Sequence, residues 1–158
     1  GEIWVSSLSV GDYLIKSGLI EKEGRKYIRT GDLGFIYNNE LFYCGRLKEI
    51  IKIRGLTHYP QDIEWSVENV KNVRKGFVCV FDIEEEIYLL VEFKEDKVDL
   101  EQIKEIRKNV SLDHGIPIKK IIVLESRTLP KTTSGKLARL KAKNMYLNNQ
   151  LTSILAIF

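Results

Sequence analysis

Twenty consecutive residues, 45–64, constrain this chain more than any other stretch, because they hold signals for a turn, a strand, a loop and a helix start. The β-branched residues within 50–53 favour a short strand over a helix. Gly55 ends that strand, and Pro60 suits the first position of a helix, where its missing N–H costs nothing. The stretch therefore predicts a strand, a tight loop and then an amphipathic helix that begins at Pro60.

The same stretch resembles a known motif. Residues 45–48 (Gly-Arg-Leu-Lys) and 51–55 (Ile-Lys-Ile-Arg-Gly) are similar to the hinge motif of the adenylate-forming ligases, which activate carboxylic acids with ATP. Residues 58–64 (His-Tyr-Pro-Gln-Asp-Ile-Glu) resemble more specifically the fatty acyl-AMP ligases, and Leu-Thr at 56–57 departs from their usual pattern. The resemblance implies that Arg46 touches the nucleotide. It also implies that the backbone at Lys48 is the pivot of a mobile lid domain.

Thr30-Gly31-Asp32 is a second candidate for chemistry. An isolated aspartate after a glycine is usually a turn residue that satisfies its own backbone. A carboxylate held there could also accept hydrogen bonds from two neighbouring hydroxyls, as a ribose presents them. Residues 29–34 (Arg-Thr-Gly-Asp-Leu-Gly) resemble the ATP-binding motif of the same ligases and precede the hinge in the family's order. The resemblance implies that Asp32 binds the ATP ribose.

A third motif, residues 129–136 (Leu-Pro-Lys-Thr-Thr-Ser-Gly-Lys), superficially suggests a phosphate-binding P-loop. That interpretation fails, because Pro130 replaces the required first glycine and Leu137 replaces the required Ser or Thr. The motif resembles the C-terminal signature of the adenylate-forming ligases, whose last lysine is catalytic. The resemblance implies that Lys136 neutralises charge as the substrate carboxylate attacks the α-phosphate, whereas Lys131 is expected only to shape the loop.

Other residues in these stretches are interpreted structurally. A histidine just before a helix-starting proline, such as His58, is more often a capping or packing residue than a catalyst. The family resemblance implies that the loop carrying His58 and Tyr59 lines the route of a phosphopantetheine arm. Trp65 is expected to pack against the apolar face of the helix.

Composition describes a soluble globular protein with a core: 44% of the 158 residues are hydrophobic and 30% are charged. Acidic residues dominate 82–101, and the charged residues within 119–143 are all basic apart from Glu125. This asymmetry suggests a surface for a phosphate or an acidic partner, although a solvated lysine-rich helix explains it as well. Nucleic acid is not expected, because the formal net charge is only +3 and Tyr146 is the only aromatic residue near the basic run.

The cysteines and histidines are too few and too separated to predict a disulfide framework or a metal site, so a reducing, cytoplasmic compartment is expected. No signal peptide or membrane span is expected either. The chain begins at Gly1 with no Met, and we expect a piece of a longer protein.

The order of patterns predicts an α+β fold. Strands are expected near 2–7, 27–37, 40–44, 76–81, 87–93 and 120–124, helices over 60–70, 99–114 and 137–150, and a loop over 11–26. Asn38-Asn39 predicts a hairpin turn between the strands 27–37 and 40–44. Asp99 and Gln102 form a capping-box signal for a helix whose apolar stripe is Leu100, Ile103, Ile106 and Val110. We expect residues 1–47 to be the last β-strands of a large N-terminal domain. Residues 48–158 are expected to form a small mobile lid with the hinge and the lysine loop.

Together the three motifs imply the C-terminal portion of a fatty acyl-AMP ligase. The implied reaction converts a fatty acid and ATP, with Mg²⁺, into acyl-adenylate and pyrophosphate, and then passes the acyl group to the phosphopantetheine arm of an acyl carrier protein. The chain lacks the family's ATP loop and fatty-acid pocket, so it is expected to be inactive alone. Two alternatives stay open: an acyl-CoA ligase C-terminal domain, and a non-catalytic module that docks a carrier protein.

Overall fold

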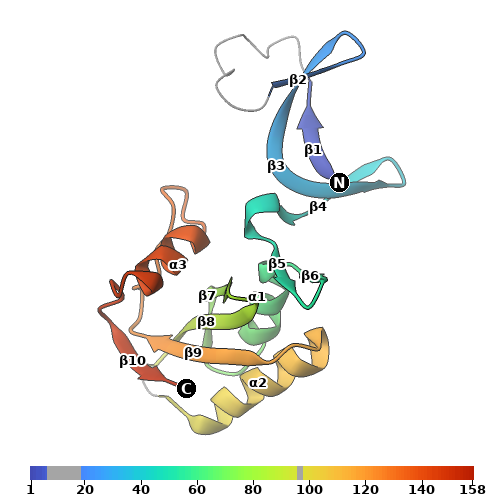
Figure 1. The fold of residues 1–158 in the computed structure, drawn as a ribbon. Helices are drawn as coiled ribbons and strands as arrows, with labels where there is room; N and C mark the ends of the chain where they lie inside the picture. The colour runs from blue at the N-terminus through green and yellow to red at the C-terminus, as the bar shows by residue number, and fades with distance from the viewer. Residues whose placement is uncertain (7–18, 96–97) are drawn as a thin grey trace. The chain divides into compact units, whose positions relative to one another are not determined.

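A computed structural model describes residues 1–6, 19–95 and 98–158 of the chain. The chain divides into two compact units, Gly1–Ile50 and Ile51–Phe158 (Figure 1). Each unit has its own sheet, and the mixed α+β class predicted from the sequence is confirmed.

The first unit is an antiparallel sheet built around one long strand. Its elements are β1 (Glu2–Val5), β2 (Leu19–Lys22), β3 (Arg25–Tyr37), β4 (Glu40–Arg46) and the short 3₁₀ helix η2 (Leu47–Glu49). Strand β3 pairs with each of the other three strands. The prediction of a loop over 11–26 is wrong where the structure describes it, because β2 and the start of β3 lie there; residues 11–18 are outside the described residues.

The hairpin between β3 and β4 sets the register of this sheet. Asn38 and Asn39 both adopt left-handed backbone angles, φ 49° and 63°, so the turn predicted at these residues is confirmed. Gly34 lies at a register shift in β3, and a Cβ built there would stand 2.5 Å from the carbonyl oxygen of Phe42. Only glycine fits this close approach, which brings the C-terminal half of β3 against β4.

The second unit has a four-stranded sheet in the order β10-β9-β8-β7 and a small β5–β6 hairpin. Strands β8 and β9 are parallel, and helix α2 makes the crossover between them. The elements in chain order are β5 (Ile51–Ile53), β6 (Leu56–His58), α1 (Pro60–Glu68), β7 (Val73–Ile83), β8 (Glu86–Phe93), α2 (Leu100–His114), β9 (Ile118–Leu124), α3 (Arg139–Leu147) and β10 (Ile154–Ile157).

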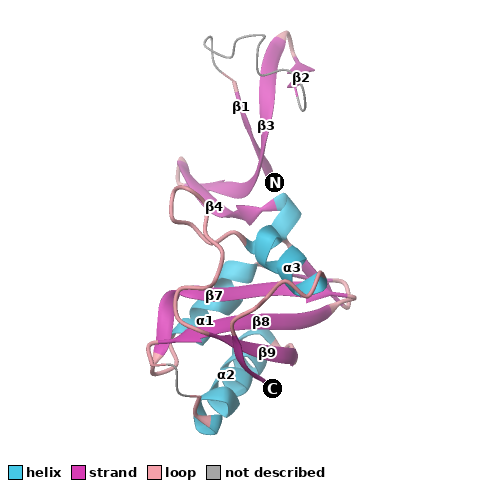
Figure 2. Cartoon of the chain, turned by 90° about the vertical axis from the view of Figure 1, so that its left-hand side faces the viewer, coloured by secondary structure: helices cyan, strands magenta, loops and turns pink. Residues whose placement is uncertain are grey.

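Both faces of this sheet are covered, which explains its apolar strands. Figure 2 shows β7, β8 and β9 running side by side, with helices on either side of them. On one face, Val80, Leu89 and Ile121 share a core with α1 and α2. On the other face, the alternate residues Phe81 and Leu90 belong to a second core with Ala142 of α3. The side chains thus alternate with the two-residue period of a strand, and each face receives its own helices.

The ends of the helices largely follow the sequence signals. Helix α1 begins at Pro60, and α2 ends at Gly115, which adopts the left-handed conformation with φ 68°. Asp99 caps α2 by accepting from the N–H of Glu101 at 3.0 Å. The reciprocal capping bond expected from Gln102 is not made within the described residues, where its Oε1 has no hydrogen-bond partner.

Three packing or length expectations were wrong. Trp65 does not pack, because 68% of its surface is exposed. It lies two residues after the buried Ile63, on the far side of the helix. Leu100, expected in the apolar stripe of α2, is also exposed at the first residue of that helix. The helix predicted over 137–150 is shorter, Arg139–Leu147, because residues 131–137 form a bridged hairpin that the motif alone did not indicate.

Candidate functional site

In the first unit, the structure brings together two of the residues predicted to contact nucleotide. Asp32 on β3 and Arg46 on β4 are direct cross-strand partners. The Nε of Arg46 lies 3.1 Å from Oδ1 of Asp32. That Oδ1 atom is buried and accepts no hydrogen bond from the residues the structure describes. The pair thus places a carboxylate, whose Oδ1 is buried beside Arg46, next to a guanidinium with several donors.

The backbone around Asp32 is held by side chains of its own strand and of β1. The Thr30 hydroxyl donates to the carbonyl of Ile3 at 2.8 Å and accepts from the N–H of Asp32 at 3.0 Å. Gly31 has a left-handed φ of 73°, and its N–H donates to Glu2. The expected glycine turn is in fact a local irregularity inside one continuous strand. This irregularity fixes the Asp32 backbone without occupying its carboxylate.

The Glu2 carboxylate on β1 accepts several hydrogen bonds. It accepts from the indole of Trp4 and the guanidinium of Arg29, as well as from Gly31. The Trp4 hydrogen bond, followed by the hydrogen bond and charge of Arg29, lowers the pKa of Glu2 below its ordinary value. This network links β1 to the segment that carries Asp32, and no motif in the sequence had indicated it.

The predicted pivot, Lys48, lies in η2 and is exposed. Its unit ends two residues later, at Ile50. The two residues flanking η2, Arg46 and Ile50, both have extended backbone angles. The role of Lys48 as a hinge stays a prediction.

In the second unit, Lys136 stands at the end of a short, exposed and internally bonded loop. Lys131 and Leu137 form an antiparallel bridge that closes the loop. Inside it, the N–H of Thr132 donates to the carbonyl of Lys136 at 2.7 Å, and the N–H of Lys136 donates to the Thr132 hydroxyl at 3.1 Å. Gly135 takes the left-handed conformation that closes the turn, with φ 80°.

All residues from Lys131 to Lys136 are exposed, so this part of the motif lies outside the cores, whereas the first residue of the motif, Leu129, is buried. No ion pair of the Lys136 ammonium group is found among the described residues. Lys131 differs, because its Nζ lies 3.5 Å from the ring centroid of Phe77 in a cation–π contact. Of the two lysines in the motif, Lys131 is held against its own domain and Lys136 is available to another group.

The structure reduces the basic surface expected over 119–143. Lys119 pairs with Glu86 at 3.0 Å, Arg139 pairs with Glu64 at 2.6 Å, and Lys143 pairs with Asp82 at 3.3 Å, each Nζ or Nη2 to a carboxylate oxygen. Internal ion pairs therefore neutralise part of the positive charge that the sequence analysis interpreted either as a surface for a partner or as a solvated lysine-rich helix.

Of the two structural roles expected for His58, capping is not seen, because the N-cap residue of α1 is Tyr59 and no side-chain hydrogen bond caps that helix. His58 is half-buried at the end of β6, and its Nε2 is buried without a hydrogen-bond partner among the described residues. Desolvation, and then the charge of His114, lowers the pKa of His58 below its ordinary value of 6.5. His114 itself shares a hydrogen bond of 2.9 Å with the hydroxyl of Ser66 on α1. His58 therefore favours its neutral form in the folded chain.

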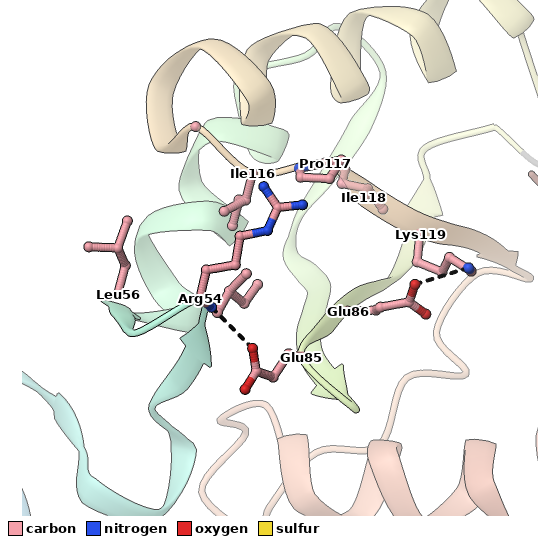
Figure 3. Close-up of a pocket in the computed structure, with 10 residues that line it drawn as sticks. Arg54, Leu56, Glu85, Glu86, Ile116, Pro117, Ile118 and Lys119 are labelled. Atoms are coloured by element: carbon pink, nitrogen blue, oxygen red, sulfur yellow. Dashed lines mark hydrogen bonds and ion pairs between the residues drawn. The ribbon is translucent and has the colours of Figure 1, made fainter.

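A pocket of about 370 Å³ that no motif had predicted lies beside the β5–β6 hairpin (Figure 3). Ile116, Pro117 and Ile118 supply apolar surface, and the side chain of Arg54 extends toward them. The backbone N–H of Arg54 donates to Glu85 at 3.1 Å, which ties the β5–β6 turn to the β7–β8 turn. The pocket comes from residues distant in the sequence, so the sequence carried no signal for it.

Metal and membrane features are absent from the described parts of the chain. These residues contain no group of three or more His, Cys, Asp or Glu side chains placed to hold a metal ion. No described helix has the length and apolar character that a membrane crossing needs.

Comparison with known proteins gives a consistent result. Residues 48–155 match a family model described as Disco-interacting protein 2-like, AMP domain. The chain is 34% identical over 170 residues to the medium-chain-fatty-acid–[acyl-carrier-protein] ligase JamA of Moorena producens (strain JHB), which covers 96% of this chain and 29% of that protein. It is also 31% identical over 137 residues to the putative fatty-acid–CoA ligase fadD21 of Mycobacterium leprae (strain TN). This alignment covers 81% of this chain and 24% of that protein.

A solved structure from work on the fatty acyl-adenylate ligases of E. coli and L. pneumophila superposes with a TM-score of 0.68 and 30% sequence identity. The match covers 78% of this chain and 23% of that one. The chain thus spans less than a third of the length of the relatives it matches.

Proposed function

The chain belongs to the adenylate-forming ligase superfamily and, within it, to the fatty acyl-AMP ligases. The family model that it matches is described as Disco-interacting protein 2-like, AMP domain. On that premise we propose that the chain is the C-terminal part of a cytoplasmic enzyme that activates a fatty acid with ATP. In the first half-reaction a fatty-acid carboxylate oxygen attacks the α-phosphorus of ATP, giving acyl-adenylate and releasing pyrophosphate. In the second, the phosphopantetheine thiol of an acyl carrier protein attacks the acyl carbon and AMP leaves.

The observation that carries this proposal is the state of Lys136. It is exposed in a loop whose backbone is hydrogen-bonded at both ends, and no carboxylate of the described residues neutralises it. Negative charge builds up on the α-phosphate as the carboxylate attacks. A cation about 4 Å from that charge stabilises it by about 4 kcal/mol at a moderate effective dielectric. Lys136 would supply that cation in the first half-reaction.

Asp32 and Arg46 would hold the nucleotide. The Asp32 carboxylate can accept hydrogen bonds from the two ribose hydroxyls, because an ionised carboxylate offers about four acceptor positions over its two oxygens. Arg46, 3.1 Å away, keeps positive charge beside that carboxylate and can donate to the nucleotide with its remaining N–H groups. Mg²⁺ would neutralise the triphosphate in such a reaction. The described residues contain no cluster of three or more His, Cys, Asp or Glu side chains, so we propose that Mg²⁺ is bound mainly by the rest of the enzyme.

The proposal also specifies which thiol accepts the acyl group in the second half-reaction. One relative is named for an acyl-carrier-protein ligase and another for a putative CoA ligase, so the relatives support both kinds of thiol. We favour the carrier protein, because residues 58–64 resemble the fatty acyl-AMP ligases. An acidic carrier would meet the basic residues within 119–143, among them Lys136, which forms no ion pair with the described residues. Carrier binding that does not depend on salt concentration would contradict this charge argument.

The full-length enzyme should be assayed with fatty acids, ATP, and either coenzyme A or holo-carrier protein. We expect pyrophosphate release with fatty acid, and acyl transfer to carrier protein in preference to coenzyme A. The isolated chain should release no pyrophosphate. Efficient transfer to coenzyme A would favour an acyl-CoA ligase. Tight carrier binding without any adenylation would favour a non-catalytic docking module and would reject the enzymatic proposal.

A further inference from the structure

Two buried carboxylates stand at the two ends of the segment that carries Lys136. Glu92 on β8 is fully buried, and Glu64 on α1 is 6% exposed. They are the only buried acidic side chains in the described chain. Burying a carboxylate is costly unless it is well hydrogen-bonded, so each must have a compensating set of donors.

Glu92 takes its donors from the backbone that leads into the loop. Its carboxylate accepts from the N–H groups of Arg127, Thr128 and Leu129, at 2.6, 2.8 and 2.8 Å. Arg127 has a left-handed φ of 66°, which is unfavourable for a residue with a side chain. The three bonds to one carboxylate hold this strained turn in place. Leu129, the first residue of the motif, is itself buried in the core beneath α3.

Arg74 supplies a positive charge to the same site. Its Nε lies 3.8 Å from Oε2 of Glu92, and its Nη2 donates to the hydroxyl of Ser126 at 3.0 Å. Arg74 therefore links Glu92 to the residue just before the strained turn. This set of contacts, here named the entry anchor, fixes residues 126–129.

Glu64 holds the other end. Arg139, the first residue of α3, donates to both oxygens of Glu64, from Nε at 2.7 Å and from Nη2 at 2.6 Å. Glu64 also accepts from the N–H of Val80 at 3.1 Å, on the edge strand β7. Burial raises the pKa of Glu64, and the hydrogen bond and charge of Arg139 oppose that change. This bidentate pair, the exit anchor, fixes the chain three residues after Lys136.

We infer that Glu92 and Glu64 are positioning residues for Lys136, which set where its ammonium group stands by anchoring the two ends of a loop that is otherwise exposed. This inference rests on the proposed role of Lys136. An exposed loop between free ends would sample many conformations, and a displacement of about 1 Å at a reacting group can cost about a hundredfold in rate. The anchors restrict that freedom although neither carboxylate touches substrate.

The first test measures the loop itself, in the 158-residue chain. Amide hydrogen exchange at residues 127–129 and 132–136 should be at least about tenfold faster in Glu92→Gln than in wild type. Glu101→Gln, which removes an exposed carboxylate on α2, should leave that exchange unchanged. Arg139→Lys keeps the charge, loses the bidentate geometry and offers a milder variant if Glu92→Gln does not fold. Unchanged loop exchange in the folded variants would overturn the inference.

The second test measures rates in the full-length enzyme. We expect Glu92→Gln to lower kcat for adenylation about tenfold or more with little change in the KM for ATP, and to leave acyl transfer from supplied adenylate within about twofold. In a Lys136→Ala background, Glu92→Gln should cause no further slowing, because the residue through which it acts is gone. Additional slowing in the double variant would overturn the inference. A Lys136→Ala enzyme with wild-type adenylation would instead reject the proposed function, and the exchange experiment would still decide the positioning claim.

Discussion

At the scale of single residues, some basic side chains near the lysine loop make contacts within the fold, and Lys136 makes no ion pair with the described residues. Lys131 contacts Phe77 and Arg139 pairs with Glu64, whereas Lys136 lies between them without an ion pair among the described residues. Resemblance of the motifs to a known family predicts roles for Lys136 and Asp32, and these roles stay predictions. The resemblance could not indicate Glu92, because a glutamate inside an apolar strand is conspicuous only once its three backbone donors, 35 to 37 residues away, are known.

Asp32→Asn tests the nucleotide site at this scale. Replacing the carboxylate with an amide removes a charged acceptor, and a hydrogen bond to a charged group contributes about 1.5–3 kcal/mol. The KM for ATP in the full-length enzyme should therefore rise about ten- to a hundredfold. Thermal stability should change little, because the pair with Arg46 is partly exposed. Asp113→Asn, on the exposed side of α2, is the matched control. An unchanged KM for ATP in Asp32→Asn would remove Asp32 from the nucleotide site.

At the scale of elements, local signals predicted most helix ends and turns, and long-range pairing decided the rest. Pro60, Gly115 and the Asn38-Asn39 turn behave as their backbone chemistry requires. Strand β10 was not predicted, because the apolar run 151–158 has no alternation and is defined by its pairing with β9. Trp65 shows the opposite error: its position relative to Ile63 already placed it away from the core, and its size alone suggested burial.

The β6–α1 junction should make stability depend on pH. The pKa of His58 is lowered in the folded chain, so the folded state binds fewer protons than the unfolded state just below pH 6.5. The free energy of unfolding should therefore fall as the pH drops below about 6.5, down to the lowered pKa. Thermal unfolding followed between about pH 7 and 5.5 would measure this. His58→Gln, which cannot titrate, should show a flatter dependence. If the unfolding free energy of wild type and of His58→Gln depended on pH in the same way, His58 would not be the source of the pH dependence.

At the scale of the whole molecule, the chain consists of two units joined just after η2, and the account requires the second to move as a lid. The residues proposed to hold nucleotide, Asp32 and Arg46, lie in the first unit, and the proposed catalytic residue, Lys136, lies in the second. The family resemblance of the motifs predicted the nucleotide-binding role of the first unit and the catalytic role of the second. Composition and periodicity predicted only the α+β class.

Lys48→Pro tests the hinge. Proline fixes φ near −65° and would restrict the backbone rotation that a pivot needs. In the full-length enzyme, the ratio of the adenylation rate to the acyl-transfer rate should change by about tenfold or more, because one lid position becomes harder to reach. Lys48→Ala, which keeps backbone freedom, should retain the wild-type ratio. A ratio unaffected by proline would place the pivot elsewhere.

The most direct measurement compares the two half-reactions in Lys136→Ala. With the full-length enzyme, isotope exchange between pyrophosphate and ATP reports adenylation, and acyl transfer to carrier protein from supplied acyl-adenylate reports the second step. We predict that Lys136→Ala slows adenylation about a hundredfold or more and leaves acyl transfer within about twofold, while Lys108→Ala, an exposed lysine on α2, changes neither. Equal losses in both half-reactions, or wild-type adenylation, would contradict the account.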